Sequence, residues 1–119
     1  MIFPRVAAVL GFLAVALGAF GAHALRARLD PAALEVWRTA ALYHLVHAVA
    51  LLAVALAGAR VRRGGLVCGL WTAGIVIFAG SLYLLAVTGV RWLGAVTPLG
   101  GAAFLAGWLV LAVTSVKQT

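Results

Sequence analysis

The stretch "ALYHLVHAVALLAVALAG" (Ala41–Gly58) is a nearly continuous apolar run that holds one tyrosine and two histidines near its start. About 20 apolar residues in a helix cross the ~30 Å hydrocarbon core of a bilayer. A helix is required there because no water is present to bond the backbone amides and carbonyls. This stretch therefore predicts a membrane-spanning helix, and it raises the question of why polar rings lie inside it.

Three further apolar runs of similar length surround this one. With it they predict spans at residues 6–25, 39–59, 64–90 and 93–116. Of the 119 residues, 66% are hydrophobic and 9% are charged, whereas a soluble domain is about 45–50% apolar and about 25% charged. The chain is too short for a second domain. We therefore expect a single domain, residues 1–119: an all-α, integral membrane four-helix bundle.

The first run has an alternative interpretation, because its basic start and its end at Ala22–Ala24 resemble a cleaved signal peptide. A signal peptide has a shorter apolar region, of about 7–15 residues, so we favour a retained helix. Between the first two spans, Asp30 followed by Pro31 is a helix-start signal. A short interfacial helical segment is expected to begin there and to lead into the second span.

Nine basic residues against two acids give the chain a formal charge of +7. The basic residues flank the apolar runs, where they set topology and face lipid headgroups, and no separate basic domain exists to bind nucleic acid. One side of the membrane holds Arg5, Arg60, Arg62, Arg63 and Lys117, and the other holds Arg26, Arg28, Arg38 and Arg91. The positive-inside rule then places both termini in the cytoplasm.

Small residues spaced by four are expected where the helices pack, because helices in lipid associate by close contact at such residues. The glycines expected at these contacts are Gly11, Gly18, Gly65, Gly69 and Gly107.

The polar residues inside the spans form the candidate site. His44 lies about 9 Å and His47 about 13 Å beyond Arg38 along a helix, and His23 is on the same side of the membrane. Because polar side chains avoid lipid, we expect an inward cluster near the first helix. Its expected members are His23, Tyr43, His44, His47 and Ser81.

Two interpretations of this cluster stay open. Neutral histidines can hydrogen-bond between helices, or His23 with His44 or His47 can ligate a metal or haem iron. No carboxylate or thiol joins them at a suitable spacing, so no cofactor is predicted. The acids Asp30 and Glu35 both lie outside the spans, and the sequence carries none of the common hydrolase, metalloprotease or phosphate-binding motifs. An enzyme is therefore not expected.

Several stretches resemble a known family. They are "GFLAVALGAFGAHAL", "WRTAALYHLVHAVALL", "FAGSLYLLAVTG" and "LGAVTPLGGAAFLAGW". In this order they are similar to the YgdD/YwdK-like family of small bacterial inner-membrane proteins, a domain of unknown function with a small eukaryotic transmembrane relative. The resemblance implies a four-helix membrane protein without an assigned activity. It marks Gly18, Gly21, His23, Tyr43, His44, His47, Gly80, Ser81, Tyr83, Thr97, Pro98 and Gly101.

Three functions are open on this basis. The first is a structural or accessory role, by packing in a larger membrane complex or by self-association. The second is a small transport or ligand-binding bundle that uses the polar cluster. The third is a redox subunit that holds haem or a metal through the histidines.

Overall fold

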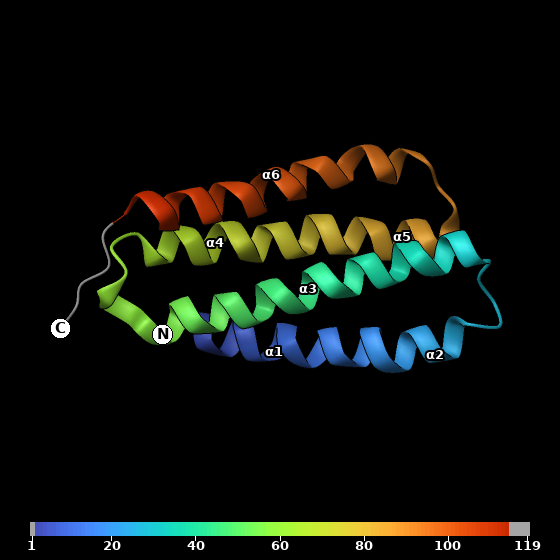
Figure 1. Ribbon diagram of the computed structural model, residues 1–119, viewed down its shortest axis with the longest axis horizontal. Coiled ribbons are helices and arrows are strands. Elements are labelled where there is room, and N and C mark those ends of the chain that lie inside the picture. The colour runs from blue at the N-terminus through green and yellow to red at the C-terminus, as the bar shows by residue number, and fades with distance from the viewer. Residues whose placement is uncertain (1, 115–119) are drawn as a thin grey trace.

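The computed structural model describes residues 2–114, and its elements are all helices. They form four rods (Figure 1). In chain order the rods are α1 (Phe3–Val15) with the π-helical turn η1 (Ala16–Gly21) and α2 (Ala22–Leu25); α3 (Pro31–Ala57); α4 (Gly64–Gly74) with the π-helical turn η3 (Ile75–Ala79) and α5 (Gly80–Thr88); and α6 (Trp92–Val113). Each rod is long and apolar enough to cross a membrane. The predicted all-α, four-span fold class is confirmed. The end of the predicted fourth span, residues 115–116, and Lys117 lie outside the described residues.

Local sequence signals set where the rods begin and end. The Asp30 carboxylate accepts a hydrogen bond from the Ala33 amide at 2.7 Å and caps α3, with Pro31 next in the chain. Because α3 runs unbroken from there, the segment predicted as interfacial forms the first turns of the second rod. Gly58 and Gly89, with φ of 58° and 70°, end α3 and α5 in a backbone region that favours glycine.

The rods lie side by side in the order of the chain (Figure 1). Successive rods run in opposite directions, so α1 begins and α6 ends at the same end of the molecule. The Cα atoms extend over 51 × 26 × 18 Å, which makes the molecule flat. As a result α3 and α4–α5 are inner rods, while α1–α2 and α6 flank them. The inner rods supply the largest fully buried side chains, Leu51, Val67, Cys68 and Trp71.

Two of the five predicted packing glycines lie at close helix contacts. A Cβ atom at Gly18 would lie 3.3 Å from the Ala41 Cβ of α3, and one at Gly107 would overlap the Trp71 ring of α4. The other three, Gly11, Gly65 and Gly69, are not at close helix contacts as predicted, because a Cβ atom at any of them would meet nothing within 4 Å. These three glycines make no close contact with a neighbouring rod, although their spacing is the same.

Three glycines that were not predicted also make close helix contacts. A Cβ at Gly21 would lie 2.8 Å from Trp37. One at Gly74 would overlap Phe104, and one at Gly100 would overlap the backbone of Phe78. Gly74, Gly100 and Gly107 together make one seam between α4–η3 and α6. Along this seam the absence of a side chain on one rod makes room for an aromatic ring or for backbone on the other.

Candidate functional site

His47, on the inner rod α3, uses both of its ring nitrogens within the chain. Its Nδ1 lies 2.8 Å from the carbonyl oxygen of Tyr43, which can only accept, so Nδ1 carries the proton. Its Nε2 lies 3.0 Å from Nε1 of Trp108 on α6, which can only donate, so Nε2 accepts. These two partners fix His47 as a neutral imidazole in one tautomer. No lone pair on its ring is left for a metal ion.

Aromatic rings surround the same imidazole. The Phe104 ring stacks on it, with the ring centroids 3.7 Å apart and the planes 12° from parallel. Trp71 and Trp108 meet it edge-on, at centroid distances of 6.1 and 5.9 Å. Only 4% of His47 is exposed. The residue therefore joins α3, α4 and α6 by packing as well as by hydrogen bonds.

His44, one turn earlier, is equally buried but less completely bonded. Its Nδ1 lies 2.9 Å from the hydroxyl oxygen of Tyr83 on α5. Its Nε2 is buried and has no hydrogen-bond partner among the described residues. A small groove of about 210 Å³ beside it is lined by Leu10 of α1 and Gly80 of α5, among others. His44 thus contributes one hydrogen bond between α3 and α5, and its second nitrogen is the polar atom in this region that the chain leaves open.

His23 and Tyr43 do not join an inward cluster, which corrects the prediction. His23 is exposed in α2, where its Nδ1 accepts from the Arg26 guanidinium at 3.2 Å. Tyr43 is 43% exposed and lies against Phe78, with ring centroids 5.0 Å apart. His23 lies in the last turn of α2, where its side chain contacts Arg26 and not the bundle interior. His23, the ligand common to both hypothetical metal-binding pairs (with His44 or with His47), is exposed and bonded to Arg26 while its two possible partners are buried, so neither pair fits this geometry. Within residues 2–114 no three His, Cys, Asp or Glu side chains are grouped to hold a metal ion.

Ser81 is buried but takes part in a different contact. Its hydroxyl donates to the Phe78 carbonyl at 3.0 Å, within the same rod, and lies 2.6 Å from the hydroxyl of Thr97 on α6. The contact with Thr97 ties α5 to α6, and neither histidine takes part in it. Ser81 and the two buried histidines are thus inter-helix hydrogen-bonding groups at two separate places.

The partners of the buried polar residues were absent from the predicted site. Trp108 bonds His47, and Tyr83 bonds His44. Trp37, similarly, donates to the Leu17 carbonyl at 2.8 Å and joins α3 to η1. The sequence offered only a general indication of these bonds: a buried indole N–H or phenol hydroxyl normally has a hydrogen-bond partner. Sequence spacing alone could not identify that partner.

Comparison with known proteins agrees with this architecture. The chain matches the family model described as a protein of unknown function (DUF423) over residues 17–101. It is 44% identical over 119 residues to the UPF0382 membrane protein YwdK of Bacillus subtilis, across 98% of this chain and 97% of that protein. It is 38% identical over 116 residues to the UPF0382 inner membrane protein YgdD of Escherichia coli, across 93% and 86%.

A membrane protein of Haemophilus influenzae is 42% identical over 98% of this chain. No solved structure matches the chain. The resemblance seen in the sequence is therefore confirmed. Because the identity extends over nearly the whole length of these relatives, the chain belongs to the DUF423 family of UPF0382 membrane proteins.

Proposed function

We propose that this protein has a structural or accessory role in the bacterial inner membrane and acts by packing against other membrane helices. The observation that carries the proposal is the bonding of His47, whose two ring nitrogens are both held inside the chain. Such a ring cannot ligate a metal or accept a proton without breaking a bond between helices. This buried polar residue of the spans thus holds helices together.

The outer face of α1 is the surface that we assign to this packing. Only Ala7 and Ala14 of α1 are buried, whereas Phe12 and Phe20 are 72% and 74% exposed. A shallow groove of about 640 Å³ runs between these two rings, over Gly11 and its neighbours. A bulky ring beside a groove of small residues suits a two-fold symmetric contact between two copies of the chain. The ring of each copy can then enter the groove of the other. The partner we assign is a second copy of this chain.

Disulfide crosslinking in native membranes tests this assignment. In a Cys68→Ala background, Ala8→Cys is expected to give a crosslinked dimer, because Ala8 lines the α1 groove. Leu105→Cys is the matched control, since Leu105 is 71% exposed on α6, the opposite flank. Adding Gly11→Leu should lower the crosslinked fraction several-fold and leave the fold intact, because a Cβ there meets nothing.

Equal crosslinking at Ala8 and Leu105 would contradict the α1 interface, as would a protein that stays monomeric at both. Crosslinks from Ala8→Cys to one larger membrane protein, without any dimer, would replace self-association by a place in a larger complex.

A second candidate function, binding of an apolar ligand, is favoured by a groove on the other side of α3. This groove of about 420 Å³ is lined by Tyr43, His47, Phe104 and Trp108, among others. Tyr43 lies near the middle of α3, and no hydrogen bond to its hydroxyl is found among residues 2–114. A flat ring with a carbonyl, such as a quinone, would stack on these aromatics and accept from this phenol.

Quenching of tryptophan fluorescence by decylubiquinone tests the second candidate. Saturable quenching is expected, with an affinity about tenfold lower in Tyr43→Phe, as for the loss of one hydrogen bond. Quenching that does not saturate, or that is identical in Tyr43→Phe, would rule this function out.

A further inference from the structure

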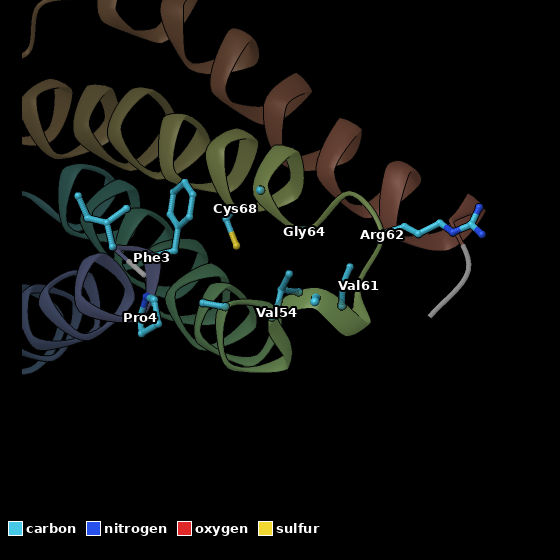
Figure 2. Close-up of a pocket in the computed structure, with 12 residues that line it drawn as sticks. Phe3, Pro4, Val54, Val61, Arg62, Gly64 and Cys68 are labelled. Carbon is cyan, nitrogen blue, oxygen red and sulfur yellow. The ribbon is translucent and has the colours of Figure 1, made fainter. Parts of the chain in front are cut away.

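A separate groove opens at the end of the molecule where α1 begins, α3 ends and α4 begins (Figure 2). Its volume is about 410 Å³. Its walls include Phe3 and Pro4 from α1, Val54 from α3, and Gly65 and Cys68 from α4. Because these walls are apolar and lie within the membrane-spanning rods, the groove suits a hydrocarbon chain.

The mouth of this groove is strongly basic. Arg62 is at the mouth, and its guanidinium extends away from the apolar lining residues (Figure 2). Arg5, Arg60 and Arg63 lie at the same end of the molecule, while both acids of the chain, Asp30 and Glu35, lie at the other end. Arginine side chains at a helix end extend in this way to the headgroup level. The mouth thus offers positive charge at the depth of lipid phosphates, with no acid of the chain beside it.

The start of α4 adds backbone donors at the same place. This helix has no side-chain cap. The Gly64 amide bonds the Val61 carbonyl and the Val67 amide bonds the Arg63 carbonyl. Between them, the amides of Gly65 and Leu66 have no acceptor among the described residues. Free amides at a helix start favour an anion, and here they lie beside Arg62 at the top of an apolar groove.

We propose that this groove binds one anionic phospholipid, with its phosphate near Arg62 and the start of α4 and one acyl chain along the groove beside Cys68. Charge complementarity selects the anionic headgroup, because a cluster of arginines without acids attracts anionic lipid. The apolar walls select a lipid over a free anion, because a free anion would leave them uncovered.

Native mass spectrometry of the detergent-solubilised protein with added phosphatidylglycerol or phosphatidylcholine tests the proposal. The wild-type protein is expected to retain one phosphatidylglycerol and to prefer it to phosphatidylcholine. Arg62→Gln should weaken this binding about fivefold, the effect of one arginine near an anionic surface. Inorganic phosphate at the same concentration should not compete.

Gly65→Leu should abolish the retained lipid by filling the groove, and it should still fold because a Cβ at Gly65 meets nothing within 4 Å. Gly69→Leu is its matched control, equally open but outside the groove. Arg28→Gln is the matched control for Arg62→Gln, at the basic but opposite end of the molecule.

The proposal is overturned if Arg28→Gln weakens binding as much as Arg62→Gln, because the attraction is then one of net charge. Retention of phosphatidylglycerol by a folded Gly65→Leu protein, or equal binding of both lipids, would overturn it too. If Gly65→Leu does not fold, Arg62→Glu on the exposed loop decides the question, since it must release the lipid.

Discussion

At the residue scale, His44 and His47 lie one helical turn apart on α3 but are bonded to different extents. His47 bonds through both nitrogens and stacks on Phe104, whereas His44 bonds only Tyr83. His23 makes its bond to Arg26 at the surface. The contribution of each histidine to the stability of this protein should therefore depend on its hydrogen-bond and packing partners.

We expect substitution by alanine to destabilise the protein in the order His47, His44, His23. His47→Ala leaves the Trp108 indole unpaired and opens a cavity, for a loss of about 2–4 kcal/mol. His44→Ala should cost about 1 kcal/mol, as for one inter-helix bond in a membrane, and His23→Ala less than about 0.5 kcal/mol. Denaturant unfolding in detergent micelles, followed by circular dichroism, measures all three, and equal losses at His23 and His47 would refute the order.

At the scale of elements, the closest seam lies between α4–η3 and α6. Gly107 faces Trp71, and Gly100 faces the backbone of Phe78, which belongs to the π-helical turn η3. The Trp71 indole also donates to the Phe104 carbonyl of α6 at 3.2 Å. Close approach at these glycines is thus what allows a hydrogen bond between the two rods.

Gly100→Ala and Gly107→Ala are each expected to destabilise the protein by about 1–3 kcal/mol, because the new methyl group forces the rods apart. Gly69→Ala on the open face of α4 is the control. It should be neutral, or stabilising by about 0.5–1 kcal/mol, from helix propensity alone. Thermal unfolding in one detergent compares the three variants. A Gly107→Ala protein as stable as Gly69→Ala would show that the α4–α6 contact is looser than described.

At the scale of the whole molecule, the four antiparallel rods place arginines at both ends and the two acids at only one. Arg5 and the connection Arg60–Arg63 lie where α1 begins, while Asp30 and Glu35 lie where α3 begins. The end without acids is the one that the positive-inside rule assigns to the cytoplasm. The same end carries the groove beside Arg62, which would then face the inner leaflet.

A reporter fused after Thr119 is accordingly expected to be cytoplasmic, fluorescent as a green fluorescent protein fusion and inactive as an alkaline phosphatase fusion. A fusion truncated after Leu29, between the first two rods, should give the opposite pattern. Active alkaline phosphatase after Thr119 would invert the topology and place the basic groove in the outer leaflet.

The sequence by itself determined the fold class and the helix ends of this protein. Apolar runs of membrane length can only be helices in lipid, and the Asp30–Pro31 cap and the turn glycines Gly58 and Gly89 act within a few residues of their own position. It also indicated that His44 and His47 would be buried. These properties depend on local chemistry and on the bilayer, so no knowledge of the tertiary arrangement was needed.

The tertiary structure decided which faces of the helices meet. Glycines spaced by four occur on several faces, and the spacing does not fix how each rod is rotated about its axis. Gly18 therefore lies at a close helix contact, whereas Gly11 and Gly65 do not. The bonding partners of His44 and His47, Tyr83 and Trp108, are 39 and 61 residues away along the chain. Only the packing of α3 against α5 and α6 brings each histidine to its partner. The two polar rings in the apolar run of α3 then form hydrogen bonds between helices.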